Sequence, residues 1–143
     1  MKKKTIKIYT DGASSGNPGP SGIGFVIYNE NGEKLKEYSE YIGLATNNIA
    51  EYSALIRALE FLKDKENLKI NIFTDSELLV KQLKGLYKVK SKNLKYLYEK
   101  VISLLSLFEY ELHHIPREEN KIADNLAKKA VEYARKSVID KSK

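Results

Sequence analysis

Residues 6–28 read IKIYTDGASSGNPGPSGIGFVIY, a stretch in which two β-rich runs flank a turn dense in Gly, Ser, Asn and Pro. The apolar, β-branched and aromatic residues predict strands over 5–10 and 22–28. Asp11 ends the first predicted strand, and the turn that follows provides no helix dipole for its charge to complement. An acid at this place therefore favours a functional role over a structural one.

The elements downstream complete the predicted order. Asn31-Gly32 predicts a two-residue hairpin that leads into a third strand, so the first three strands form an antiparallel meander. Helical spacing of apolar residues begins at Asn48, and two short apolar strands interrupt the helices that follow. The predicted elements after the second strand are strand 33–42, helix 48–65, strand 69–74, helices 76–84 and 92–108, strand 110–115 and a helix over 120–136 with an Asn start signal.

The order βββαβααβα predicts an α/β fold with a five-stranded mixed sheet flanked by helices. A chain of 143 residues suits one domain, which we place at 1–136, followed by a polar, frayed tail at 137–143. In sheets of this kind, functional sites lie outside the carboxyl ends of the strands.

Composition excludes several classes of site. The chain has no cysteine, so disulfides and thiolate metal sites are excluded. No apolar run approaches the roughly 20 residues that a membrane span needs, and we expect a soluble, cytoplasmic protein with no membrane partner. The formal net charge of +6 favours polyanionic partners, although lysine-rich composition also occurs in proteins that bind no nucleic acid.

Two strands end in the same way: IYTD closes the first at Asp11 and IFTD closes the fourth at Asp75. A right-handed crossover through the helix between them would make these strands parallel neighbours, with the two carboxylates side by side. Two such anions repel each other, so a compensating positive charge is expected.

The other acids at element ends also have structural explanations. Asn48 to Glu51 matches a capping box, Asp75 could cap the helix that follows it, and Asp124 could complement the dipole of the last helix. Together, however, Asp11, Glu51, Asp75 and Asp124 can converge at one end of the sheet. Carboxylate oxygens suit Mg²⁺ or Mn²⁺, and two such ions about 3.5–4 Å apart would hold a phosphodiester for attack by water.

Four blocks of sequence resemble the ribonuclease H type 1 family, in order and at suitable spacing. They are YTDGASSGNPGPSGIGF, TNNIAEYSALIRAL, IFTDSELLVKQL and HIPREENKIADNLAKKA, and the resemblance runs from Lys4 to about Arg135. It implies metal-dependent endonucleolytic hydrolysis of the RNA strand of RNA/DNA hybrids, which leaves 5′-phosphate and 3′-hydroxyl ends.

The resemblance also implies roles for the four acids. Asp11 would bridge two Mg²⁺ ions, for which Mn²⁺ is a substitute. Glu51 and Asp75 would bind the ion near the leaving group, and Asp124 would bind the ion that holds the attacking water. Water bound to such an ion is easier to deprotonate.

Further residues are implied to contact the substrate. Small and amide side chains after Asp11 and before the first helix would approach the minor groove, where an amide can recognise a 2′-hydroxyl. Gly and Asn also simply build turns. The predicted contacts to the hybrid's minor groove and backbone are Gly12, Ser14, Asn17, Thr46, Asn47, Asn48 and Ser76. Lys88 and Lys90 are predicted to contact the backbone of the DNA strand.

Three departures from the family pattern affect these roles. Some members carry glutamine where this chain has Glu77, which accepts hydrogen bonds but cannot donate them when ionised. Only GLYKVKSKNLK replaces the large basic loop of long members, so we expect weaker, more salt-sensitive binding. His114 has the spacing of a mobile catalytic histidine, yet it falls within a predicted strand, and a residue of 117–119 is the alternative.

Other readings remain open at this stage. The same fold with an inactive site would be a module that binds hybrids or double-stranded RNA without cutting, and cleavage of double-stranded RNA beside hybrids is a third possibility. The ATPases that share this core need two lobes and phosphate loops, which 143 residues without a P-loop motif do not hold. We expect the protein to act as a monomer.

Overall fold

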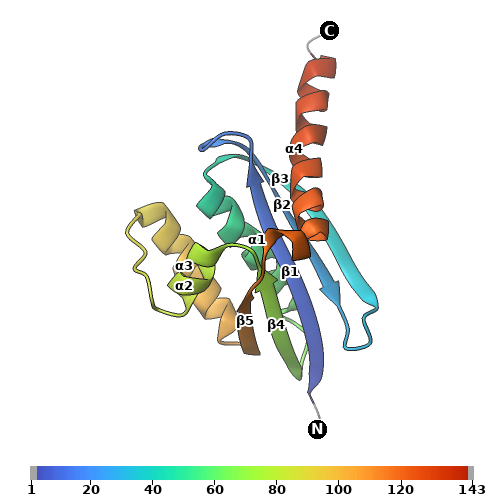
Figure 1. Cartoon of the computed structure of the whole chain (residues 1–143), viewed down its shortest axis with the longest axis vertical. Coiled ribbons are helices and arrows are strands. Elements are labelled where there is room, and N and C mark those ends of the chain that lie inside the picture. The colour runs from blue at the N-terminus through green and yellow to red at the C-terminus, as the bar shows by residue number, and fades with distance from the viewer. Residues whose placement is uncertain (1–2, 142–143) are drawn as a thin grey trace.

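A computed structural model describes the backbone of residues 3–141 and the side chains of residues 3–136. It confirms the predicted order of elements and the five-stranded mixed sheet (Figure 1). The strands lie in the order β3-β2-β1-β4-β5. The elements are β1 (Lys4–Ser14), β2 (Gly19–Tyr28), β3 (Lys34–Ala45), α1 (Asn47–Leu62), β4 (Leu68–Thr74), α2 (Glu77–Leu83), α3 (Lys92–Leu105), β5 (Glu109–His114), the 3₁₀ turn η1 (Arg117–Glu119) and α4 (Lys121–Lys141).

The sheet combines an antiparallel meander with two parallel pairs. β1 pairs with β2 and β2 with β3 in antiparallel register, whereas β1 pairs with β4 and β4 with β5 in parallel. Tyr9 of β1 lies opposite Phe73 of β4, so the predicted adjacency of these two strands is confirmed. Asp11 and Asp75, each two residues beyond this pair, therefore lie next to each other at the same end of the sheet.

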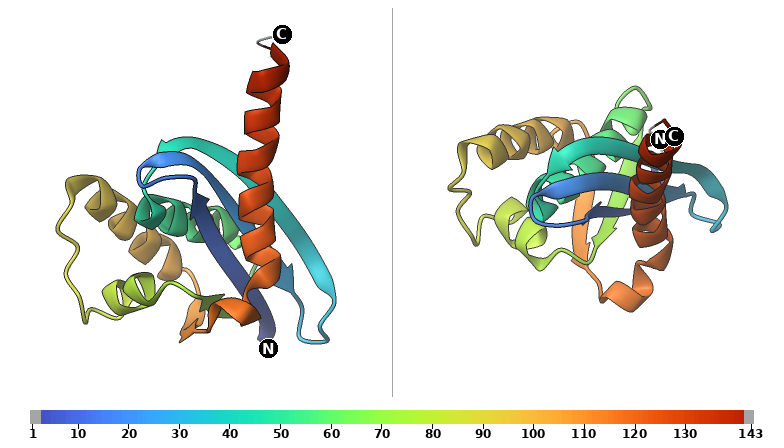
Figure 2. Two further views of the ribbon diagram at one scale, coloured as in Figure 1. Left: turned by 45° about the horizontal axis from the view of Figure 1, so that its top comes forward. Right: turned by 90° about the horizontal axis from the view of Figure 1, so that it is seen from above.

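Helices cover the two faces of the sheet unequally (Figure 2). Ile8, Phe25 and Ile72 point to the face where α1 packs, and α1 in turn packs against α3. Gly24 precedes Phe25 and points to the opposite face, against which α4 packs along β2, β1 and β3. The continuous apolar core therefore lies between the sheet and α1.

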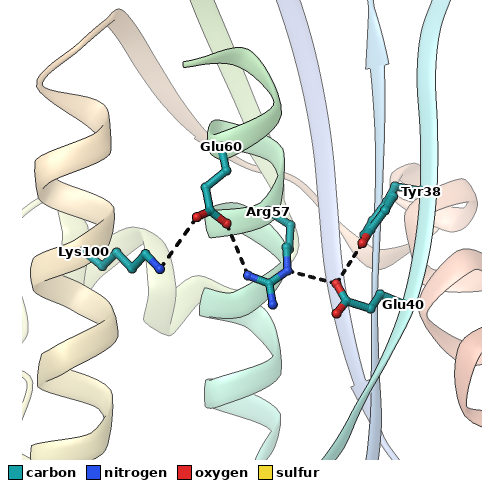
Figure 3. A network of polar contacts seen from close by, with 5 residues as sticks. All are labelled: Tyr38, Glu40, Arg57, Glu60 and Lys100. Carbon is teal, nitrogen blue, oxygen red and sulfur yellow. Dashed lines mark hydrogen bonds and ion pairs between the residues drawn. The ribbon is translucent and has the colours of Figure 1, made fainter. Parts of the chain in front are cut away.

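Polar contacts tie the outer strand to the helices on the core face (Figure 3). Arg57 of α1 donates from Nε to Glu40 of β3 at 2.9 Å and from Nη1 to Glu60 at 3.2 Å. Glu40 also accepts from the Tyr38 hydroxyl, and Lys100 of α3 lies 3.7 Å from Glu60. These half-exposed pairs contribute little individually, but together they join three elements.

The first strand differs from the prediction at its end. β1 does not stop before Asp11 but continues to Ser14, and β2 begins at Gly19 rather than residue 22. The pairing continues because Ser14 lies opposite Ser21 and the two hydroxyls hydrogen-bond at 2.9 Å. Asp11 therefore lies inside a strand, where neighbours on both sides fix its direction.

The predicted two-residue hairpin at Asn31-Gly32 is wrong. Tyr28 pairs with Lys34, so residues 29–33 form a five-residue loop next to an irregularity in the strand pairing. The Asn29 side chain stabilises this loop by accepting from the backbone N–H groups of Asn31 and Glu33. A five-residue loop stabilised by the Asn29 side chain therefore replaces the predicted two-residue hairpin turn.

Helix ends also shift by a few residues. α1 ends at Leu62 and α3 at Leu105, three residues before the predicted ends at 65 and 108. α4 extends to Lys141, through most of the segment expected to be a frayed tail, and residues 142–143 lie outside the described part of the chain. Within residues 3–141, no helix combines the length and the apolarity needed to span a membrane.

Candidate active site

Three of the four predicted acids lie together at the end of the sheet where β4 stops beside β1. One carboxylate oxygen from each of Asp11, Glu51 and Asp75 lies within 4.8 Å of the other two. Asp124, in the first turn of α4, lines the same cavity of about 430 Å³. Residues far apart in the chain thus bring four carboxylates to one cavity.

Glu51 is held by the first strand and not by its own helix. Its Oε1 accepts a hydrogen bond from the Gly12 backbone N–H at 3.2 Å. The predicted capping box at Asn48 is wrong, because Thr46 is the N-cap and accepts from the Ile49 N–H. A Cβ at residue 12 would lie 2.5 Å from the Glu51 backbone nitrogen, so glycine there permits this approach.

Asp75 does not cap the helix that follows it. Ser76 is the N-cap of α2 and accepts from the Leu79 N–H at 3.2 Å, so the interpretation of Asp75 as a helix cap is wrong. Asp75 is the first residue after β4 and is half-buried in the acidic cavity. Its carboxylate is therefore available to a ligand.

Burial and mutual repulsion make these acids unusually basic. Desolvation raises the pKa of Asp11 far above its ordinary value, and the nearby Glu51 raises it further. Desolvation also raises the pKa of Glu51 and of Asp75, although the Arg117 guanidinium partly opposes the shift at both. The cluster consequently favours protons or cations over free negative charge.

The donor set fits a hard divalent cation. Glu51 is 9% exposed, and its Oε2 has no hydrogen-bond partner among the described residues. A buried carboxylate oxygen without a partner is costly unless a ligand satisfies it. Carboxylate oxygens are the ligands that Mg²⁺ and Mn²⁺ prefer. The residues present therefore suit a metal site.

Asp124 has a second partner on its own helix. Lys128 Nζ lies 3.0 Å from Asp124 Oδ2, and Lys128 also lines the acidic cavity. The interpretation of Asp124 as a first-turn acid thus describes its position correctly, but it omits this ion pair. The four-residue spacing of an acid and a lysine is the signal that predicts such a pair.

The predicted substrate residues divide into two groups. Gly12, Ser14, Asn47, Asn48 and Ser76 line the acidic cavity. Asn17 and Thr46 do not line this cavity: Asn17 Oδ1 accepts from the Asn47 N–H at 3.0 Å, and Thr46 caps α1. These two residues hold the β1–β2 turn and the start of α1 in place.

His114 lies on β5, and the residues of the turn 117–119 lie along two separate cavities. His114 is exposed at the last position of β5, as predicted from the strand pattern. Arg117 lines the acidic cavity, whereas Glu118 and Glu119 line a separate groove beside Tyr9. Among the alternatives at 117–119, Arg117 is therefore the one that reaches the acids.

The basic connector lies between α2 and α3. Lys88 and Lys90 are exposed, and the Lys88 carbonyl accepts from Gln82 at 3.4 Å. Glu77 lies at the start of α2 and pairs with Lys81 at 2.6 Å, so its carboxylate is partly neutralised. These residues lie outside the acidic cavity.

Asn120 adjoins this site without lining its cavity, and the sequence alone indicates only a helix start there. It is 1% exposed, and its Nδ2 donates to the Thr10 carbonyl at 2.9 Å, next to Asp11. No local pattern distinguishes such a side chain from an ordinary helix cap, because its partner lies 110 residues away.

The chain is similar to known proteins over most of its length. A family model described as reverse transcriptase-like matches residues 9–130. Ribonuclease HI of Halobacterium salinarum is 40% identical over 130 residues, and Ribonuclease H of Chlorobaculum parvum is 37% identical over 146 residues. These matches cover 90% of this chain in both cases, with 65% of the halobacterial and 97% of the Chlorobaculum protein.

Other similar proteins are longer, or are known as solved structures. The bifunctional protein Rv2228c of Mycobacterium tuberculosis is 38% identical over 134 residues, which are 92% of this chain and 37% of that protein. The chain thus spans about two thirds or less of several relatives that it matches. The crystal structure of LC11-RNase H1 in complex with RNA/DNA hybrid superposes with a TM-score of 0.85 at 46% identity, over 90% of this chain and 98% of that chain.

Proposed function

Because the chain belongs to the type 1 ribonuclease H family, we propose that it hydrolyses the RNA strand of RNA/DNA hybrids and leaves 5′-phosphate and 3′-hydroxyl ends. The observation that carries this proposal is the approach of Asp11, Glu51 and Asp75 to within 4.8 Å of one another. The solved complex of the similar LC11-RNase H1 with an RNA/DNA hybrid supports the choice of substrate. All four acids are present, which argues against an inactive binding module.

The proposed cofactors are two Mg²⁺ ions, with Mn²⁺ as a substitute. Asp11, Glu51, Asp75 and Asp124 would hold them, because these residues supply hard oxygen ligands around one cavity. When bound, such ions supply an activated water and stabilise negative charge on the phosphoryl and leaving oxygens. The unpartnered Oε2 of Glu51 supports this assignment.

Residues of the chain itself would orient the reacting groups. The Gly12 N–H holds the Glu51 carboxylate in place, so that acid is preorganised before any ligand arrives. Arg117 and Lys128 bring positive charge to the cavity wall, where a phosphate would be stabilised by a guanidinium or an ammonium group. His114, exposed on β5, is the alternative for a supporting role in proton transfer.

Recognition of RNA is assigned to the polar wall of the same cavity. Asn47, Asn48 and Ser76 present amide and hydroxyl groups, which can hydrogen-bond a 2′-hydroxyl that DNA lacks. The Ser14 hydroxyl already bonds Ser21 and the Ala45 carbonyl, so Ser14 would contribute mainly by shaping this wall. Asn17 and Thr46 would contribute indirectly, because they hold the two segments that form this wall. Gly12 would let the backbone approach closely.

The DNA strand is assigned to the basic connector, where Lys88 and Lys90 are exposed. Lysines make phosphate contacts that do not depend on base sequence. One chain supplies all four acids, so the proposed active unit is a monomer.

Cleavage of an end-labelled RNA strand tests the proposal. The RNA is annealed to DNA and incubated with Mg²⁺, Mn²⁺ or chelator, beside double-stranded RNA, single-stranded RNA and a DNA duplex. We expect metal-dependent cutting of the hybrid's RNA strand, and we expect Asp75→Asn to lower the rate by at least about a hundredfold because a ligand is lost.

Asp64→Asn is the matched control, since it makes the same chemical change at an exposed acid beyond α1. Its rate should equal that of the wild type. Hybrid binding without cutting in either metal would favour the inactive module, and equal cutting of double-stranded RNA would widen the substrate class. Full activity in Asp75→Asn would contradict the assignment of the acids.

A further inference from the structure

Asn120 joins two segments that carry acids of the site, β1 and the start of α4. It is the residue before α4, it is 1% exposed, and its side chain reaches back to β1, where Nδ2 donates to the Thr10 carbonyl at 2.9 Å. Thr10 is the neighbour of Asp11. The Asn120 carbonyl accepts from the Asp124 N–H at 3.1 Å, so the same residue also begins the turn that carries Asp124.

Asn120 does not act as an ordinary helix cap. An asparagine before a helix usually accepts, through its side-chain oxygen, a hydrogen bond from the backbone of the first turn. Here Oδ1 is buried and has no partner among the described residues, while the amide nitrogen binds a strand carbonyl. The side chain therefore does not cap α4 and instead hydrogen-bonds to a backbone carbonyl of β1.

The hydrogen bond between Asn120 and Thr10 is buried and joins residues 110 positions apart. It therefore fixes the start of α4 against β1, next to Asp11.

We infer that Asn120 is a positioning residue that fastens the start of α4 to β1, and so holds Asp124 beside Asp11. This inference rests on the proposed function only in taking these acids as metal ligands. Residues that orient metal ligands commonly change metal affinity by tenfold to a hundredfold when they are removed.

Isothermal titration of Mn²⁺ into the metal-free full-length protein tests this inference without nucleic acid. We expect Asn120→Ala to weaken Mn²⁺ binding by about tenfold to a hundredfold while the protein remains folded. Asn120→Ser keeps one donor, so its affinity should lie between those of Asn120→Ala and the wild type. It also serves as the milder variant if Asn120→Ala does not fold.

Gln82→Ala is the matched control. Gln82 is another buried amide that donates to a backbone carbonyl, that of Lys88, and it lies on α2 outside the acidic cavity. Gln82→Ala should lower the denaturation midpoint to a similar degree but leave Mn²⁺ affinity at the wild-type value. A loss of affinity in both variants would mean that general destabilisation is responsible, and it would overturn the inference.

Wild-type affinity in a folded Asn120→Ala or Asn120→Ser variant would also overturn it. Failure of the wild type to bind Mn²⁺ would reject the metal assignment and this inference together. Binding of Mn²⁺ without cleavage of hybrids would reject only the proposed activity and would leave the role of Asn120 standing.

Discussion

Asp11 and Glu51 are two carboxylates buried beside each other, and their charges set how stability depends on pH. Desolvation raises the pKa of both side chains in the folded protein. Between the ordinary pKa values and the raised ones, the folded protein holds more protons than the unfolded chain. Its stability must therefore fall as pH rises through this range.

The first prediction follows for the metal-free protein. With chelator, the melting temperature should fall between about pH 6 and pH 8, and Asp11→Asn should flatten this slope and stabilise the protein at pH 8 by about 1 kcal/mol, or roughly 2–4 °C. Saturating Mg²⁺ should raise the melting temperature most at the higher pH, because a metal binds the deprotonated acids. A slope unchanged in Asp11→Asn would contradict the assignment.

The second prediction concerns which of two side chains, Arg117 or His114, supports cleavage. Arg117 lines the acidic cavity and lowers the pKa of two of the acids, whereas His114 is exposed at the end of β5. Arg117→Ala should therefore lower the cleavage rate by about a hundredfold, and His114→Ala by no more than about threefold. Single-turnover cleavage of the labelled hybrid measures both rates. The reverse order would return the supporting role to His114.

At the scale of elements, the position of α4 depends on how closely it approaches β2. A Cβ at residue 24 would lie 2.5 Å from the Ala123 carbonyl oxygen and 2.6 Å from Leu126 Cβ. The absence of a side chain in this strand lets the helix lie directly on the sheet. Because Asp124 follows Ala123, this packing also determines where that acid is placed.

Gly24→Ala should consequently disturb both stability and the site. We expect a loss of about 1–3 kcal/mol in the free energy of unfolding, since the strand and the helix must separate. We also expect weaker Mn²⁺ binding, measured by titration calorimetry. Gly43→Ala is the control: a Cβ there meets nothing within 4 Å, but φ is +83°, so it should cost stability without changing Mn²⁺ affinity. Unchanged stability in Gly24→Ala would argue against this account.

At the scale of the whole molecule, the net charge is +6, and its effect on nucleic-acid binding depends on where the lysine and arginine side chains lie. The exposed lysines of the connector between α2 and α3 are separated from the acidic cavity, so they can meet a phosphate backbone without neutralising the acids. Binding through such contacts releases counterions and must weaken as salt rises.

Hybrid affinity should therefore fall steeply with salt in an inactive Asp75→Asn background. Replacing Lys88 and Lys90 together by alanine should reduce the slope of log K against log salt by about 1–2. Replacing Lys63 and Lys65, which follow the last residue of α1, makes the same change in net charge and should leave the slope nearly unchanged. Fluorescence anisotropy over a range of salt concentrations measures these slopes. Equal slopes in all three proteins would contradict the assignment of the connector.

Local patterns predicted most of the fold. Alternating and helical spacing of apolar residues predicted the element order and the mixed sheet, and IYTD with IFTD predicted that Asp11 and Asp75 lie side by side. These signals are readable because the periodicity of a strand or helix is a property of consecutive residues. The ends of elements were less predictable, since neighbouring segments compete for the same backbone groups.

The amino-acid pattern alone thus predicted which elements form and in what order, and that Asp11 and Asp75 lie side by side. Packing of distant segments, in contrast, makes Glu51 hydrogen-bond Gly12 instead of capping its helix, and makes Asn120 bind Thr10 across 110 residues. It also decided that Arg117 faces the acids and that Asp11 is buried. The physical reason is that burial and hydrogen bonding between distant segments depend on how helices and sheet pack, which no local pattern encodes.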